Sequence, residues 1–278
     1  GIALPYDGWT YAEFRDVVKK LTHGEGQDKV YGICWGFNFT KAAQLDYINS
    51  VLGANDTFAD DTMKTLNWDN QVYVDGFNLI KDICDEGCAP TMEDDIADAL
   101  TVQSTFLEGK CAICGLAMDT ETYPHDFTTA LIPFPVPSED YAEFYTQDQA
   151  NYSGDFICIS ASTPYKEAAC EFTRWYIQGG MTPLIKAARY PLWLGTDMDA
   201  ILDYVEQSAG DSVDIESLKH LFSTDRSSYV KKSYVNDKGG ELSTILHEEW
   251  EDFMYGVTPT AEEALKKATE RGNALLAE

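Results

Sequence analysis

The sequence predicts an α/β fold, and three observations carry that prediction. Segments with apolar residues at helical spacing alternate along the chain with short, strand-like apolar segments, the pattern of helices packed on a sheet. Hydrophobic residues make up 44% and aromatic residues 13% of the 278 residues, which is enough to build a core and excludes a disordered chain. No internal repeat or low-complexity linker interrupts the alternation. The length fits one large domain or two ordinary ones.

Capping and stop signals bound the elements of the first half of the chain. A capping box formed by Thr10 and Glu13 opens the first helix, and glycines or prolines end most of the others. In chain order we expect a helix from Thr10 to Gly24, a strand over 30–36, a helix over 41–52, a helix from Asp69 or Asn70 to Gly87, a helix over 96–106 and a strand over 111–116.

The second half begins with three prolines in residues 130–137, which confine any strand there to the edge of a sheet. The Tyr-rich residues 138–154 read as a loop or flap, and Asp155–Ser160 as a strand. Thr163 and Pro164 are then the expected cap and first residue of a helix. The predicted helices cover 167–178, 183–188, 197–208, 214–222, 242–255 and, after a second capping box at Thr260, the C-terminal residues.

The charge of the chain excludes several classes of partner. Lys and Arg number 20 against 47 Asp and Glu, a net charge of −27, so nucleic acids and anionic membrane surfaces are repelled. No segment approaches the roughly 18 consecutive apolar residues that a membrane-spanning helix needs. The first residues lack the features of a signal peptide. We therefore expect a cytosolic protein or one whose targeting segment lies outside these residues.

Seven cysteines are an odd number without the density of a disulfide scaffold, so at least one thiol has no disulfide partner. This favours a reducing or anoxic setting. The pairs Cys84/Cys88 and Cys111/Cys114 have spacings found in zinc sites. However, Cys111 and Cys114 fall on a predicted strand, where residues three apart point to opposite faces. We expect small buried hydrophobic side chains here, and neither a metal nor a cofactor.

No catalytic motif is present. The sequence has no phosphate-binding glycine loop, no serine-hydrolase elbow, no zinc-protease helix and no calcium loop. The acidic clusters at Asp60–Asp61 and Glu93–Asp95 are typical of solvated surfaces in so acidic a chain. A hydrolase that uses two carboxylates stays open, because such pairs are assembled in space rather than in sequence.

Four segments, in order, resemble the extracellular solute-binding proteins of ATP-binding-cassette (ABC) importers, the maltose-binding-like receptors. Residues 1–14, GIALPYDGWTYAEF, are similar to the entry into that family's second lobe, and residues 106–113, FLEGKCAI, to its F-x-x-G-K-x-A-M motif. Residues 154–175 resemble its strand followed by K-E-A-A-x-E-F-x-x-W, and residues 256–268 its closing T-x-E-E-A-L segment. Together they span almost the whole chain. Within these segments, Trp9, Phe172 and Trp175 are expected to be packing residues.

The resemblance implies a periplasmic-binding-protein-like fold of class II. By the family's layout, residues 1–157 and 233–278 form the C-terminal lobe, a mixed sheet flanked by helices. Residues 158–232 form a helical crossover segment that completes an N-terminal lobe, most of which this chain lacks. We therefore expect the crossover helices to expose apolar surface, to pack on the C-terminal lobe or to pair between chains.

The resemblance also implies a function. A receptor of this family captures a small solute, most often a mono- or oligosaccharide, in a cleft between two lobes and delivers it to a membrane permease. It is not an enzyme and needs no cofactor. It is extracellular, and we expect a lipidated N-terminus, outside this chain, to anchor it.

The expected ligand-binding residues are aromatic side chains that stack on sugar faces and polar groups that bind hydroxyls. Asp119 stands where maltose-binding relatives place a tryptophan, which argues against linear maltodextrins. Packing in the core is an alternative role for Trp35, and Tyr190 and Trp193 have a packed loop as their alternative. The set comprises Trp35, Phe37, Phe39, Asp119, Glu121, Tyr123, Tyr152, Asp155, Tyr190 and Trp193.

Three alternatives remain at this point. The same fold can bind a polyamine or another cationic solute, because the carboxylates of the set also pair with amines. A carbohydrate-active enzyme is the second alternative. The third is an interaction module that senses ligand for a membrane-bound partner.

Overall fold

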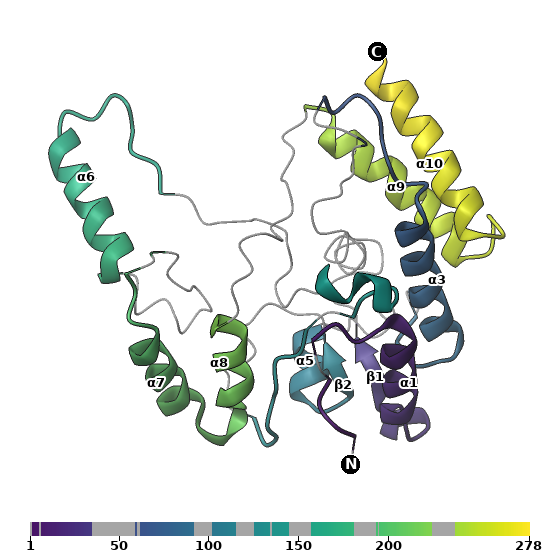
Figure 1. Ribbon diagram of the computed structural model, residues 1–278, viewed down its shortest axis with the longest axis horizontal. Coiled ribbons are helices and arrows are strands. Elements are labelled where there is room, and N and C mark those ends of the chain that lie inside the picture. Colours follow the sequence, from purple (N-terminus) through teal and green to yellow (C-terminus); the bar gives the residue numbers. More distant parts are fainter. Residues whose placement is uncertain are drawn as a thin grey trace. The chain divides into compact units, whose positions relative to one another are not determined.

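The computed structural model (Figure 1) divides into two compact units. Unit 1 comprises Gly1–Gly115, Ile132–Tyr152 and Asp225–Glu278, and unit 2 comprises Leu116–Leu131 and Ser153–Thr224. The predicted boundaries of the two lobes stay a prediction. The structure describes residues 2–5, 7–34, 59, 62–91, 102–114, 125–133, 135–144, 157–180, 193, 195–223 and 237–278.

Both units are mainly helical in their described parts. No helix among the described residues is long and apolar enough to cross a membrane. The elements of unit 1 are α1 (Tyr11–Leu21), β1 (Tyr31–Cys34), α3 (Gln71–Asp85), α5 (Val102–Leu107), β2 (Cys111–Cys114), α9 (Gly239–Met254), α10 (Ala261–Leu276) and short 3-10 turns at Gly26–Asp28 and Glu139–Phe144. Those of unit 2 are α6 (Lys166–Trp175), a π-helical turn (Tyr176–Gly180), α7 (Met198–Ala209), a 3-10 turn (Gly210–Ser212) and α8 (Ile215–Ser223).

Strands β1 and β2 form a parallel pair in which Cys34 lies opposite Cys114. Helices α1 and α5 pack against this pair. A Cβ atom at Gly32 would lie only 2.1 Å from the Val18 carbonyl oxygen, so glycine is what lets α1 approach β1 this closely. The proline-rich segment reaches the same unit through a parallel bridge between Thr10 and Val136, as expected for an edge position.

The core of unit 1 lies among α1, α3, α9 and α10. Figure 1 shows α9 and α10 as a hairpin, and α10 also contacts α3. The large side chains Trp9, Trp68 and Trp250 are each at most 2% exposed. The Trp9 indole donates a hydrogen bond of 2.8 Å to the Pro133 carbonyl, which satisfies its N–H inside the core.

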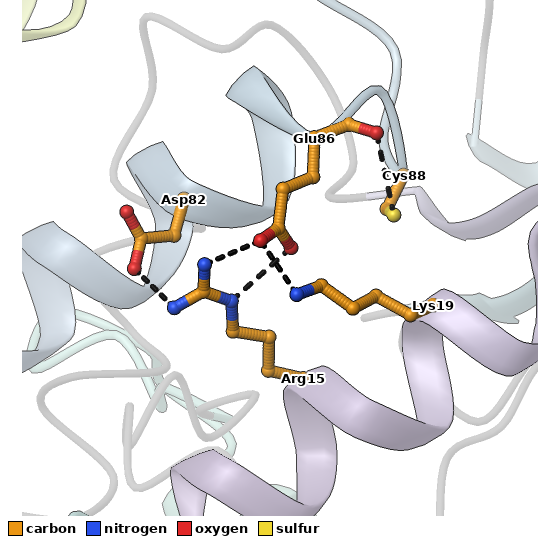
Figure 2. Close-up of polar contacts among 5 residues, drawn as sticks. All are labelled: Arg15, Lys19, Asp82, Glu86 and Cys88. Atoms are coloured by element: carbon orange, nitrogen blue, oxygen red, sulfur yellow. Dashed lines mark hydrogen bonds and ion pairs between the residues drawn. The ribbon is translucent and has the colours of Figure 1, made fainter.

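An ion-pair network joins α1 to the end of α3 (Figure 2). The Arg15 guanidinium binds the carboxylates of both Asp82 and Glu86, and the Lys19 ammonium lies 2.6 Å from Glu86. The last turn of α3 has no basic residue, and the carboxylates of Asp82, Asp85 and Glu86 stand at its negative end. Arg15 and Lys19 supply the positive charge that this end needs, and the pKa of Glu86 falls to about 2. The hydrogen bond from Arg15 is the main cause, followed by the one from Lys19.

A second ion pair ties α10 to α9. The Arg271 guanidinium donates to the Glu249 carboxylate at 2.7 Å and also binds Glu248. The Glu249 side chain is only 8% exposed, and its Oε2 atom has no hydrogen-bond partner. Because a buried carboxylate is costly without a cation, Arg271 is the residue that makes this position tolerable.

Unit 2 has a small core of its own. Helices α7 and α8 bring Ile201, Val205 and Leu218 together, each at most 3% exposed. Leu131 packs on them, and a parallel bridge between Thr129 and Val213 connects its segment to the turn before α8. The predicted helices over 197–208 and 214–222 are therefore confirmed. The expectation that the crossover helices expose apolar surface does not hold for this pair, which buries an apolar face within unit 2.

Local signals were reliable guides to the helices. Both predicted caps sit at helix starts: Thr10 and Glu13 form the reciprocal capping box, and at the second position the Glu263 N–H donates to Thr260 Oγ1. Asn70 is the N-cap of α3. Helix α9 begins at Gly239, ahead of the start predicted at residue 242. The predicted helices over 41–52 and 183–188 lie outside the described residues.

Three expectations at the start of unit 2 are wrong. Residues 157–160 of the predicted strand 155–160 form no strand, because no other described segment pairs with them. The N-cap of α6 is Tyr165 rather than Thr163, whose hydroxyl instead accepts from the Tyr165 N–H. Phe172 and Trp175, expected to be packing residues, are each 57% exposed.

The network at Glu86 predicts a specific pH dependence. Its folded pKa is lower than the ordinary value of 4.5, so its stabilisation is complete above about pH 5 and disappears as the pH falls towards 2. We expect Glu86→Gln to lower the free energy of unfolding by about 1 kcal/mol at pH 7 and by progressively less below pH 5. Urea titrations at several pH values measure this. Glu108→Gln is the control, since Glu108 and its partner Lys110 are 57% and 53% exposed, and it should change nothing beyond about 0.5 kcal/mol. A pH-independent loss for Glu86→Gln would contradict the assignment.

Phe77 tests the core. It is fully buried, and its ring centroid lies 4.5 Å from that of Trp250 and 5.9 Å from that of Phe253. Because truncation leaves a cavity, Phe77→Ala should reduce the free energy of unfolding by about 3–5 kcal/mol in urea denaturation. Phe172→Ala, at an exposed position, should cost no more than about 0.5 kcal/mol. Equal losses for the two variants would show that the assignment of the core is wrong.

Candidate functional site

The edge of the sheet at which β1 and β2 end is the first candidate site. Because the strands are parallel and Cys34 is paired with Cys114, both carboxyl ends reach this edge side by side. In open α/β sheets, ligands bind outside the carboxyl ends of the strands. The chain continues from Cys34 into Trp35 and from Cys114 into Gly115, and six of the ten predicted ligand residues follow these two exits within nine positions.

The structure places one of the ten predicted residues. Trp193, in unit 2, is 40% exposed, and its carbonyl accepts a hydrogen bond of 2.9 Å from Thr196 just before α7. Its ring lies so close to Gly195 that a Cβ there would be 2.4 Å from it. The other nine lie outside the described residues, so they stay predictions: Trp35, Phe37, Phe39, Asp119, Glu121, Tyr123, Tyr152, Asp155 and Tyr190.

Cysteines contribute to both strands at this edge of the sheet, Cys34 in β1 and Cys111 and Cys114 in β2. Cys111 to Cys114 is a strand, as predicted, and none of the seven cysteines is joined in a disulfide. In the described part of the chain, no three His, Cys, Asp or Glu side chains are grouped so that they could hold a metal ion. The neighbouring Cys34 thiol and burial raise the pKa of Cys111, so this thiol stays protonated at neutral pH.

A surface cavity that the sequence did not predict lies at the end of α6. It has a volume of about 340 Å³ and is lined by Glu171, Arg174, Trp175, Gln178 and the glycines that follow. The Trp175 ring lies over Gly180, where a Cβ would be 2.7 Å from it. In the sequence, the pair Gly179–Gly180 marks only the end of a helix and gives no sign of a cavity.

Thiol reactivity tests the burial of the cysteines. Cys158 and Cys170 are exposed, whereas Cys34, Cys88 and Cys111 are buried. With a chromogenic disulfide reagent under native conditions, we expect two thiols to react quickly and the buried ones to be slower on the order of 100-fold, because they react only when the structure opens. The double variant Cys158→Ser with Cys170→Ser should remove the fast phase. Rapid reaction of all seven thiols would contradict the packing of β1 and β2.

No protein-family model matches the chain, and no curated protein matches its sequence. Solved structures do resemble it. An ABC substrate-binding protein from Listeria monocytogenes, in complex with cycloalternan, is 16% identical with a TM-score of 0.64; the match covers 100% of this chain and 66% of that one. A sugar transporter from Rhizobium etli, in an open conformation, is 14% identical with a TM-score of 0.63 and coverages of 97% and 65%.

The maltose/maltodextrin-binding domain from Bdellovibrio bacteriovorus, bound to maltotriose, is 17% identical with a TM-score of 0.57. That match covers 100% of this chain and 68% of the domain. The chain thus spans about two thirds of the length of its structural neighbours, slightly less for the first two. The predicted fold class is confirmed: the chain has the periplasmic-binding-protein-like fold found in the solute-binding proteins of ABC importers.

Proposed function

We propose that the chain is part of a receptor that captures a mono- or oligosaccharide and delivers it to the permease of an ABC importer. The observation that carries this proposal is the structural likeness over 97% to 100% of the chain to sugar-binding receptors. Cycloalternan and maltotriose, the ligands named for two of these neighbours, are both saccharides.

The chemistry of the predicted residues supports a sugar ligand. Aromatic rings such as Trp35 and Tyr123 offer apolar faces to the C–H faces of a sugar ring, and carboxylates such as Asp119 and Glu121 accept hydrogen bonds from hydroxyls. Both types follow the adjacent carboxyl ends of β1 and β2, where ligands of α/β sheets bind.

The proposal includes the organisation of the whole receptor. Residues 1–157 and 233–278 form one lobe, and residues 158–232 belong to the other. The solute lies between the lobes, which close on it by hinge motion. The receptor works outside the cell, anchored by a lipidated N-terminus. It performs no catalysis, in keeping with neighbours that are binding proteins.

Isothermal titration calorimetry on the product of the complete reading frame tests the ligand. The panel holds cycloalternan, maltotriose and monosaccharides beside the polyamines putrescine and spermidine. We expect saturable heat with at least one sugar and none with the amines. Heat with amines alone would contradict the sugar proposal and favour a cationic solute.

A pair of variants tests the site. Asp119→Asn should weaken the binding of the sugar found in that panel about tenfold or more, because hydrogen bonds to a charged acceptor are worth about 1.5–3 kcal/mol. Asp126→Asn is the matched control, since Asp126 lies on the surface and has no part in the predicted set. Equal affinities for the two variants would remove Asp119 from the site.

A further inference from the structure

The last residues of β1 and β2 are both cysteines, and the register of the sheet places them opposite each other. Cys34 ends β1 and Cys114 ends β2 (Figure 1). In the parallel pairing, Cys34 is the partner of Cys114. Hydrogen-bonded strands lie about 4.8 Å apart, and residues in register point to the same face of the sheet. The backbone therefore directs both thiols to one face, with their Cα atoms one strand spacing apart.

This spacing suits a disulfide bond. Such bonds join cysteines whose Cα atoms are about 4.4–6.8 Å apart and whose Cβ vectors do not point away from each other. The spacing of the two strands falls within that range, so the bond can close without a rearrangement of the backbone. Neither Cys34 nor Cys114 is joined in a disulfide in this structure.

Burial gives the two thiols different roles. Cys114 is half-buried, whereas Cys34 is only 3% exposed. A small disulfide in solution therefore reaches Cys114 first, and Cys34 needs to reach only a sulfur across the sheet. Cys111 is a poorer partner because it lies opposite Tyr31, and its raised pKa keeps its thiol protonated at neutral pH. Only the thiolate attacks a disulfide.

We propose that Cys34 and Cys114 form a site of reversible oxidation, at which a small disulfide such as oxidised glutathione converts the two thiols into one intramolecular disulfide. The Cys114 thiolate attacks one sulfur of the small disulfide, and the other half leaves as a thiolate. The Cys34 thiolate then attacks the Cys114 sulfur and releases the remaining half. Two electrons pass from the cysteine pair to the small disulfide, and the two protons end on the two small thiols that are released.

The bond joins the two chain exits on which the proposed ligand site is built. Six of the ten predicted ligand residues follow Cys34 or Cys114 within nine positions. A covalent link between the two strand ends fixes the spacing of these exits whatever ligand they bind. The inference therefore goes beyond the proposed function and does not depend on it.

Oxidation of the intact chain tests this inference without any sugar. The double variant Cys158→Ser with Cys170→Ser serves as the background, because it lacks the two exposed thiols. After treatment with oxidised glutathione under native conditions, we expect an intact mass about 2 Da lower, no attached glutathione, and a link between the peptides of Cys34 and Cys114. No oxidation, or glutathione that stays on the protein as an adduct, would overturn the inference.

Single variants in this background separate the two possible partners of Cys34. Cys114→Ser should abolish the intramolecular bond, and Cys111→Ser, the matched control on the same strand, should leave it intact. A link that persists in Cys114→Ser, or that disappears in folded Cys111→Ser, would overturn the assignment. Fragmentation of the linked peptide from the background protein identifies the bonded residue directly, so the test holds even where a variant does not fold.

Urea unfolding shows whether the bond forms within the native packing. The link closes a loop of about 80 residues, and a closed loop constrains the unfolded chain. We expect the oxidised background protein to unfold at a urea concentration about 0.5 M or more above that of the reduced protein, with the difference lost in Cys114→Ser. An equal or lower midpoint after oxidation would show that the native pair does not accept the bond, and would overturn the inference.

Discussion

The apolar faces of α1, α3, α9 and α10 exclude water from one core, and the rest of unit 1 is built around it. Burial of a large apolar side chain contributes about 1.5–3 kcal/mol, and this core holds three nearly inaccessible tryptophans. The parallel pair β1–β2 contains only four residues per strand, too few to be stable alone, and depends on α1 and α5 packing against it. The site that we propose at the carboxyl ends of these strands therefore depends on the packing of α1 and α5.

The need to bury an apolar face also shows how α6 differs from the other helices. Helices α7 and α8 bury theirs within unit 2 by packing Ile201, Val205 and Leu218 together. Helix α6 has an equally amphipathic sequence, yet none of its residues is buried. Its ion pair between Glu171 and Arg174 is on the surface and contributes little, so nothing within the described chain compensates for the exposed rings.

The sequence predicted what depends on neighbouring residues and missed what depends on distant ones. The caps at Thr10 and Thr260 act over three residues, so the sequence shows them and they locate the starts of α1 and α10 correctly. Residues 157–160 pair with no other described segment and form no strand, and their alternation of apolar residues could not reveal that. The burial of Phe172 likewise depends on what lies opposite. The pairing of Cys34 with Cys114 sets the place of the candidate site, and no spacing in the sequence encodes that register.

A crystal structure of the complete reading frame's product, grown with a sugar that it binds, tests the central claim most directly. The account predicts a sugar within hydrogen-bonding distance of residues that follow β1 and β2. A sugar bound elsewhere on the receptor would contradict it.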